Sequence, residues 1–203
     1  MSFKWILAKI ILYIPFKFIF RLRVYGSHNV PRKGPCIICV NHTSFWDPPF
    51  VGFASPRELH FLAKRELFEN VKAFGMLISF YNAIPIDREN SLSGLKRAMN
   101  LLKEGKALVI FPEGTRNRTK NKFLLPLKEG AALLSLKMNV PIIPAYLFES
   151  KGNVLDWITG KRKLRIRFGK PLLPGVYKMD SDDPVKDLTK DIEWRMRELY
   201  ARG

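Results

Sequence analysis

Short apolar runs alternate with stretches of helical periodicity along most of this chain. Residues 36–40, 107–111 and 142–146 are continuous apolar runs of the kind that form buried strands. Residues 91–103 and 127–138 instead carry apolar side chains three and four positions apart, which indicates helices. Buried strands separated by helices form largely parallel sheets that are covered on both faces. The pattern therefore predicts an α/β fold with a mostly parallel central sheet flanked by helices.

The C-terminal part predicts one more strand and a final helix. Residues 164–168 alternate strictly between apolar and basic, so we expect a half-buried strand with a basic outer face. Together with residues 161–163 this stretch forms a basic patch, typical of a solvated face, although it would also suit anionic lipid or an acidic carrier. The last helix is expected to start near Asp183 and Pro184, which suit a helix N-terminus. We find no linker or repeat that would divide residues 25–203, so we predict one domain there.

Residues 1–24 are apolar but interrupted by basic side chains. The longest uncharged run, residues 10–16, contains Pro15 and lies between Lys9 and Lys17. A spanning helix needs about 20 mostly apolar residues, and this run is shorter. No signal-peptide cleavage site follows it. We therefore predict an N-terminal helical segment that lies in the membrane interface; the alternative is a core helix whose lysines extend to solvent.

The charge balance favours an anionic membrane surface as a partner. The chain has 35 Lys and Arg against 18 Asp and Glu, a net charge of +17, which requires an acidic partner. Nucleic acid is disfavoured because the aromatic residues concentrate at the N-terminus and in predicted buried strands. Cys36 and Cys39 lie three apart on a predicted strand and would face opposite sides, so we expect buried free thiols and no metal site.

His42 and Asp47 follow the first buried strand closely and are candidates for general-base chemistry. Pro48 and Pro49 come next and disfavour a helical conformation for Asp47, which we expect to be extended or at a helix N-cap. A tight loop would then bring the two side chains together, leaving one imidazole nitrogen held by the carboxylate and the other able to take a proton. The alternative is that the aspartate only caps a helix and the histidine only fills a turn.

A second polar loop, Phe111-Pro112-Glu113-Gly114-Thr115-Arg116, follows another predicted strand. Ligands of open α/β sheets bind beyond the carboxyl ends of the strands, where both this loop and His42 are expected. A flexible glycine, a hydroxyl and a guanidinium together suit the binding of a phosphate group.

These loops resemble the motifs of a known enzyme family. NHTSFWD (residues 41–47), YNAIPIDR (81–88), FPEGTR (111–116) and VPIIPA (140–145) are similar, in order, to the four motifs of the lysophosphatidic acid (1-acyl-sn-glycerol-3-phosphate) acyltransferases. Leu127 and Asn117 depart from the residues usual in that family, and neither is a proposed catalytic group. No G-x-S-x-G nucleophile elbow occurs in the sequence.

The resemblance implies transfer of an acyl chain from a thioester of acyl carrier protein or coenzyme A to the sn-2 hydroxyl of lysophosphatidic acid. His42 would be the general base and Asp47 would orient it, with no cofactor or metal. The substrate-binding residues would be Lys64, Arg88, Glu113, Gly114, Thr115 and Arg116. Another phosphorylated or lysolipid acceptor and, from a different class, a non-catalytic basic binding module are the alternatives. We expect a monotopic peripheral enzyme on the cytoplasmic face of the membrane.

Overall fold

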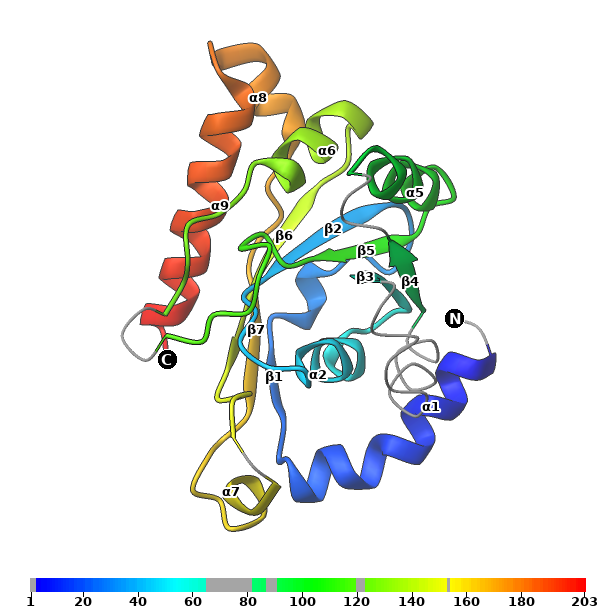
Figure 1. Cartoon of the computed structure of the whole chain (residues 1–203), viewed down its shortest axis with the longest axis vertical. Helices are drawn as coiled ribbons and strands as arrows, with labels where there is room; N and C mark the ends of the chain where they lie inside the picture. The colour runs from blue at the N-terminus through cyan, green and yellow to red at the C-terminus, as the bar shows by residue number, and fades with distance from the viewer. Residues whose placement is uncertain (1–2, 65–81, 87–90, 120–122, 153) are drawn as a thin grey trace.

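The computed structural model describes residues 3–64, 82–86, 91–119, 123–152 and 154–203 (Figure 1). The strands are β1 (Arg23–Tyr25), β2 (Cys36–Val40), β3 (Leu59–Lys64), β4 (Ala83–Ile86), β5 (Ala107–Ile110), β6 (Ile142–Phe148) and β7 (Arg165–Phe168). The helices are α1 (Phe3–Ile14), η1 (Pro15–Ile19), η2 (Ser27–Asn29), α2 (Asp47–Ala54), α5 (Ser91–Lys103), α6 (Gly130–Met138), α7 (Val154–Ile158), α8 (Pro174–Asp180) and α9 (Pro184–Ala201).

The seven strands form one sheet in the order β1-β7-β6-β2-β5-β3-β4. Every neighbouring pair is parallel except β6 and β7, which run antiparallel. The predicted α/β architecture is confirmed. The centre of the sheet is β2, which lies between β5 and β6, so the loop after β2 emerges from the best-supported position in the molecule.

The side chains of β2 alternate between two apolar cores, one on each face of the sheet. Cys36, Ile38 and Val40 belong to one core, and Ile37 and Cys39 belong to the other. The two thiols therefore face opposite sides of the sheet, as predicted. Burial raises the pKa of Cys36 to about 11 and that of Cys39 to about 12, so both are protonated thiols at neutral pH.

Helices cover both faces of the sheet. One core takes aromatic anchors from the N-terminal segment, α2 and α7; the buried ones are Trp5, Phe16, Phe50 and Trp157. The other core is covered by α5, α6 and α9, which pack beside one another in Figure 1. The stripe predicted for the last helix is buried: Leu188, Ile192 and Met196 lie in this core, and Leu199 packs with Tyr146 and Phe148. Coverage on both faces explains why the central strands read as continuous apolar runs.

The first residues of α9 and α6 can be compared with the helix starts that the sequence predicted. Asp183 caps α9, because its carboxylate accepts a hydrogen bond from the Lys186 N–H, and Pro184 begins the helix as predicted. The helix expected from residue 127 instead begins at Gly130. The reason is that the Lys128 N–H donates to the Pro112 carbonyl at 2.8 Å, which ties that stretch to the loop after β5 and keeps it out of the helix.

The N-terminal segment has two different faces. Trp5 and Phe16 are buried, and Phe16 stacks on Phe53 with ring centroids 4.5 Å apart. Large apolar side chains on the opposite face are exposed, namely Phe3, Ile6, Leu7, Ile10, Ile11 and Phe18. None of the helices in the described part of the chain combines the length and apolar character of a bilayer-spanning segment.

Lys9 differs from the other basic residues of this segment. Its ammonium donates a hydrogen bond to the Ser55 carbonyl, and burial lowers its pKa. It was expected among the lysines that face anionic lipid, but it lies on the side of α1 that packs on the domain. Position within the helix, which the pattern of charges alone does not give, decides its role.

Candidate active site

The site begins where β2 and β5 end side by side. These strands are parallel, with Cys39 opposite Ile110, so the residues that follow them leave the sheet at the same edge. The His42 backbone N–H donates to Glu113 Oε1 at 2.8 Å, which joins the two loops directly. The expectation that both loops share one edge of the sheet is confirmed.

The His42 imidazole is held by the Asp47 carboxylate. Nδ1 of His42 lies 2.8 Å from Oδ2 of Asp47; the aspartate is fully buried and the histidine keeps a small exposed surface. With the proton on Nδ1, the imidazole donates to the carboxylate and Nε2 is left as a proton acceptor. Within the described residues Nε2 has no hydrogen-bond partner, so this geometry suits a general base.

Asp47 also organises the backbone around the histidine. Its Oδ2 accepts hydrogen bonds from the N–H groups of Thr43 and Ser44, at 2.7 and 2.9 Å, in addition to the imidazole. The expectation that Asp47 would be extended or an N-cap is wrong, because it is the first residue of α2 and Trp46 is the N-cap. The turn between His42 and α2 brings the two side chains together, and the prolines occupy the first helical turn, where no backbone N–H partner is lost.

Glu113 is a buried carboxylate that binds backbone rather than solvent. Besides the His42 N–H, it accepts a hydrogen bond from the Leu125 N–H through Oε2 at 2.8 Å. Burial raises its pKa, and the two backbone hydrogen bonds oppose that shift. Both oxygens are thus used within the protein. These contacts support a positioning role for Glu113 more than the substrate contact that the sequence predicted.

Two further contacts that the sequence did not reveal fix the histidine. The imidazole stacks on the Phe111 ring with centroids 4.1 Å apart, and the His42 carbonyl accepts a hydrogen bond from the Asn117 N–H at 2.6 Å. Phe111 and Asn117 lie at the two ends of the FPEGTRN stretch. The sequence did show an aromatic residue, Phe111, beside a polar loop. It could not show that Phe111 contacts His42, because that contact depends on the packing of two loops about 70 residues apart.

Arg116 lies over the Phe45 ring, with its guanidinium carbon 3.5 Å from the ring centroid. Partial burial and the neighbouring Arg118 lower its pKa from a very high value, while the nearby Asp47 opposes the change, so Arg116 stays cationic at neutral pH. Phe45 belongs to the His42 loop. The Arg116 guanidinium is therefore held against the loop that carries the His42–Asp47 dyad. Its N–H groups can donate hydrogen bonds to an anion bound beside that loop.

The other predicted substrate-binding residues are placed differently. Gly114 has a φ of +70°, a left-handed conformation that favours glycine over residues with a side chain. Thr115 is exposed beside it. Lys64 ends β3, opposite Ile86 of β4, and its side chain lies outside what the structure describes. Arg88 also lies outside the described residues.

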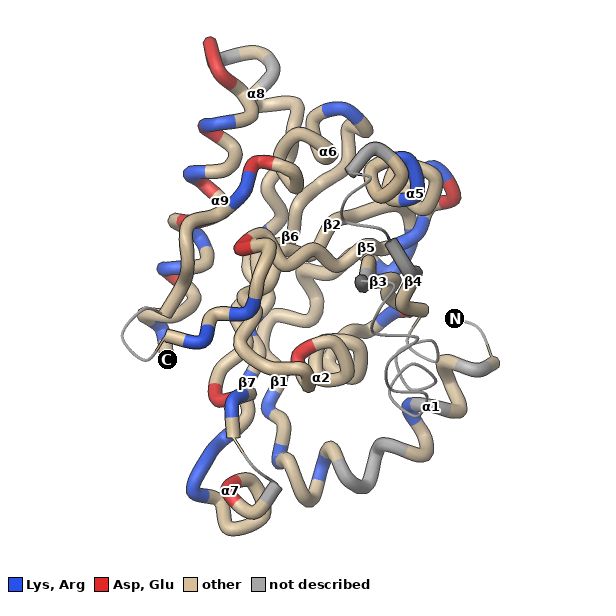
Figure 2. Tube along the Cα trace, viewed as in Figure 1, with Lys and Arg blue, Asp and Glu red and all other residues tan. Residues whose placement is uncertain are grey.

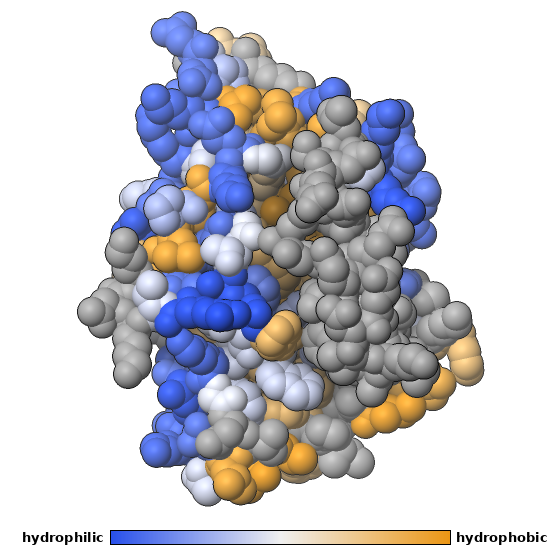
Figure 3. All heavy atoms as spheres, viewed as in Figure 1, coloured by the Kyte–Doolittle hydropathy of each residue, from blue (hydrophilic) through white to orange (hydrophobic). Residues whose placement is uncertain are grey.

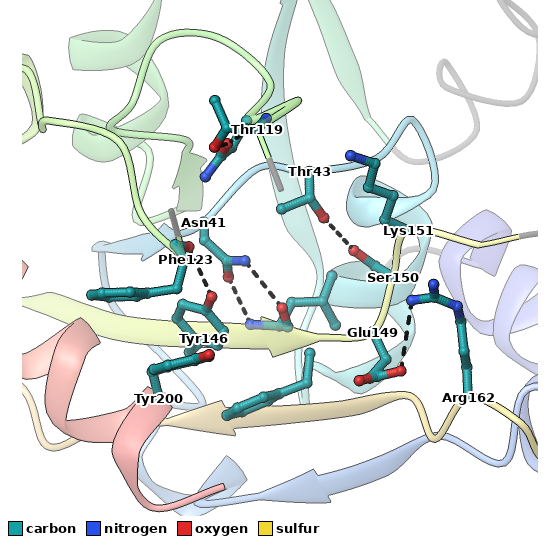
Figure 4. A pocket seen from close by; sticks show the side chains of 13 residues that line it. Asn41, Thr43, Thr119, Phe123, Tyr146, Glu149, Ser150, Lys151, Arg162 and Tyr200 are labelled. Atoms are coloured by element: carbon teal, nitrogen blue, oxygen red, sulfur yellow. Dashed lines mark hydrogen bonds and ion pairs between the residues drawn. The ribbon is translucent and has the colours of Figure 1, made fainter. Parts of the chain in front are cut away.

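A small open cavity of about 210 Å³ adjoins the dyad loop on the β6 side (Figure 4). Figure 4 shows Thr43 and Ser150 pointing toward one another, and their hydroxyls are 2.8 Å apart. The Asn41 side chain ties the end of β2 to the Leu147 backbone by two hydrogen bonds. These hydrogen bonds attach the loop that carries His42 to β6 and the residues that follow it.

The described residues contain no group of three His, Cys, Asp or Glu side chains arranged to hold a metal ion.

Known proteins resemble this chain over most of its length. The family model described as Acyltransferase matches residues 21–147. A 1-acyl-sn-glycerol-3-phosphate acyltransferase of Bacillus subtilis is 32% identical over 182 residues, 88% of this chain and 87% of that protein. The human 1-acyl-sn-glycerol-3-phosphate acyltransferase alpha is 33% identical over 143 residues, 68% of this chain and 50% of that protein.

The crystal structure of the 1-acyl-sn-glycerophosphate (LPA) acyltransferase PlsC from Thermotoga maritima has the same fold. It superposes with a TM-score of 0.70 and 22% identity, covering 99% of this chain and 83% of that one. The family match spans β1 through most of β6, including the whole His42 site. This chain therefore belongs to the acyltransferase family that includes the 1-acyl-sn-glycerol-3-phosphate acyltransferases.

Proposed function

We propose that this protein transfers an acyl chain from a thioester to the sn-2 hydroxyl of 1-acylglycerol-3-phosphate, giving phosphatidic acid for phospholipid synthesis. The observation that carries the mechanism is the His42–Asp47 contact at 2.8 Å, made from a fully buried carboxylate at the carboxyl end of the central strand. The curated relatives that bear this activity in their names match the chain across the same region.

In this mechanism Nε2 of His42 removes the proton of the sn-2 hydroxyl as the oxygen attacks the thioester carbonyl. Asp47 keeps the imidazole in the correct tautomer and stabilises the imidazolium that forms. The tetrahedral intermediate then collapses, the C–S bond breaks, and the thiolate of coenzyme A or acyl carrier protein leaves and takes up the proton. No covalent acyl-enzyme is required.

The phosphate of the acceptor is assigned to the cations around this edge of the sheet. Arg116, held against Phe45 beside the dyad loop, is the described candidate. Lys64 and Arg88 are further candidates from the sequence motifs. Guanidinium groups bind phosphate through paired, charge-assisted hydrogen bonds, and each such bond contributes about 1.5–3 kcal/mol.

We also propose that the protein works as a monotopic enzyme on the cytoplasmic face of the membrane. Its acceptor and product are lipids, while its thioester donor is water-soluble. The exposed apolar face of α1 and η1, with Phe3, Ile10 and Phe18, gives the protein a surface that can enter the headgroup region. The net charge of +17 favours an anionic leaflet.

The test combines a substrate panel with one pair of variants. Purified protein is given acyl-carrier-protein and coenzyme A thioesters with lysophosphatidic acid, glycerol-3-phosphate and monoacylglycerol, and products are identified by mass spectrometry. We expect phosphatidic acid as the main product. His42→Ala should reduce turnover at least about 10²–10⁴-fold while lysophosphatidic acid still binds. His28→Ala, an exposed histidine on η2, is the control. Normal turnover in His42→Ala would refute the mechanism.

A further inference from the structure

Helix α7 is a short helix that presents large apolar side chains to solvent. Leu155 is 67% exposed and Ile158 is 47% exposed, whereas Trp157 between them is only 1% exposed. A five-residue helix has little stability of its own, so its conformation depends on the buried tryptophan. The two apolar side chains of Leu155 and Ile158 remain largely open to solvent, which makes α7 a candidate contact surface.

Trp157 fixes α7 against the N-terminal segment. Its ring lies 5.3 Å from the Phe20 ring and 5.8 Å from the Phe50 ring, both in edge-to-face geometry, and its indole N–H donates to the Glu149 carbonyl at 3.1 Å. At the end of α7, a Cβ on Gly160 would lie 3.2 Å from the Arg21 guanidinium. The α7 hairpin and the end of the N-terminal segment are therefore immediate neighbours.

The exposed apolar residues of α7 continue the exposed face of the N-terminal segment. In Figure 1, α1 and η1 follow the lower right edge of the molecule and α7 forms its lowest point. Figure 3 shows hydrophobic residues along this same lower margin. The exposed side chains along it include Ile10, Phe18, Leu155 and Ile158. They come from two segments about 140 residues apart in the sequence, joined through Phe20 and Trp157.

Basic side chains border α7 on the other side. Lys161 and Lys163 follow the helix and are exposed, and Arg21 and Arg23 lie at the end of the N-terminal segment. Figure 2 shows this basic stretch between α7 and β7. Arg162 is instead used within the hairpin, 3.7 Å from Glu149 and 3.6 Å from Asp156. An apolar tip next to unburied lysines matches the cross-section of an anionic leaflet, with acyl chains below phosphates.

We propose that α7 is a second membrane-contact element, in which Leu155 and Ile158 insert into an anionic leaflet beside the N-terminal segment while Lys161 and Lys163 contact lipid phosphates. This inference extends the membrane association proposed above. Two membrane contacts, one from the N-terminal segment and one from α7, would fix the orientation of the domain on the bilayer. A single helix would leave the domain free to rotate about the helix axis.

The apolar part is tested by vesicle sedimentation with the full chain. Leu155→Ser/Ile158→Ser is compared with wild type on vesicles of phosphatidylcholine mixed with phosphatidylglycerol. Loss of two inserted side chains should weaken binding about tenfold or more. Leu173→Ser/Val176→Ser is the matched control, because these residues are similarly exposed at the α8 end of the molecule and should not affect binding. Equal binding by wild type and the α7 variant would overturn the proposal.

The charged part is tested with Lys161→Glu/Lys163→Glu. Binding to the anionic mixture should fall about tenfold or more, since each basic residue near such a surface contributes about 1 kcal/mol, while weak binding to pure phosphatidylcholine should not change. Lys103→Glu/Lys137→Glu, on α5 and α6, makes the same change of charge elsewhere and should have a much smaller effect. Equal losses from both pairs would mean that net charge alone acts, and α7 would not be a contact.

Acyl transfer to a short-chain, water-dispersed lysophosphatidic acid separates this inference from the proposed function. The α7 variants should retain that activity, which also reports that they are folded. Absence of transfer in the wild type would refute the proposed function, while the vesicle results would still decide the role of α7. Loss of dispersed-substrate activity and of the thermal transition in the α7 apolar variant would instead mean that Leu155 and Ile158 are structural, which would contradict the proposal.

Discussion

Asp47 and Glu113 are two buried carboxylates that follow the neighbouring strands β2 and β5, and they make different contacts. Each accepts hydrogen bonds from backbone N–H groups of a loop. Asp47 directs the same oxygen to an imidazole as well, whereas Glu113 uses one oxygen on each of two separate segments. Asp47 is thus positioned to affect proton transfer, and Glu113 to affect the distance between loops.

The comparison shows that burial and backbone hydrogen bonds are common to both carboxylates and do not distinguish them. Asp47 differs from Glu113 because it contacts the His42 imidazole, a side chain that can gain or lose a proton. Oδ1 of Asp47 has no hydrogen-bond partner in the described part of the chain, so the Asp47 charge is only partly satisfied by the backbone. In the proposed mechanism, the Asp47 charge would stabilise the imidazolium that forms on His42 during acyl transfer.

The largest expected difference between the carboxylates is in turnover. Asp47→Asn should lower kcat about 10²–10⁴-fold, because the tautomer of His42 is no longer enforced and the imidazolium loses its counter-charge. The measurement is steady-state transfer to dispersed lysophosphatidic acid, with Asp182→Asn as a surface control. A loss smaller than tenfold would mean that Asp47 only holds the backbone, as Glu113 does.

The second prediction concerns Arg116, which is carried by the loop that Glu113 fastens. Arg116→Gln should raise the KM for lysophosphatidic acid about ten- to hundredfold, because charge-assisted hydrogen bonds to the phosphate are lost. KM for monoacylglycerol, which lacks the phosphate, should not change. Arg32→Gln, an exposed arginine before the start of β2, whereas His42 follows the end of that strand, provides the control. Equal effects on both acceptors would assign Arg116 a structural or donor-binding role.

Glu113→Gln should have a smaller effect on catalysis and a measurable effect on stability. The amide places a donor against one of the two backbone N–H groups that the carboxylate now accepts, at a cost of about 1–3 kcal/mol in the free energy of unfolding. Turnover should fall about tenfold or less. Denaturant unfolding and kcat measured on the same preparation test this, beside Glu104→Gln. A loss of turnover as large as that of Asp47→Asn, without loss of stability, would assign Glu113 to the chemistry.

The smallest expected effect is local and uses the buried thiols of β2. With pKa values raised to about 11 and 12, Cys36 and Cys39 are protonated at pH 8 and should react only when the sheet opens. Glu113→Gln should increase their labelling rate several-fold, because one of the contacts that join the loops after β2 and β5 is weakened. Asp47→Asn should not, since its hydrogen bonds lie within one loop. Equal labelling rates in the two variants would mean that Glu113 and Asp47 do not differ in how they join the loops.

Most of the central fold could be predicted from the sequence because its strands are buried on both faces. Runs such as residues 36–40 and 107–111 have one physical explanation, and their order with helices gives a parallel sheet. The antiparallel placement of β7 could not be predicted, because alternation in residues 165–168 reports one exposed face and no direction. The start of α6 was predicted three residues early, because its tie to Pro112 is a contact between distant segments.

The contact between His42 and Asp47 could be predicted because the end of the strand at Val40, the turn and Pro48 follow one another closely in the sequence. The residues that hold the dyad in place could not be predicted. Phe111 under the imidazole and Phe45 under Arg116 each need both loops to be in place. The N-terminal segment was assigned to the interface with a core helix as the alternative, and α1 has both characters, with Trp5 buried and Ile10 exposed. A pattern of single residues does not show which side of a helix meets the protein.

The edge strand β1 has a consequence for how the chain acquires its structure during synthesis. Its one sheet neighbour among the described strands is β7, with Arg23 paired to Arg165, so roughly 140 residues must be made after β1 before its hydrogen bonds can form. At translation rates of about 5–20 residues per second, that interval is roughly 7 to 28 seconds. The apolar segment before β1 therefore leaves the ribosome long before Trp157 and the β7 edge exist to receive it. The order of strands in the sheet therefore sets how long the apolar segment is made without the part of the domain against which it packs.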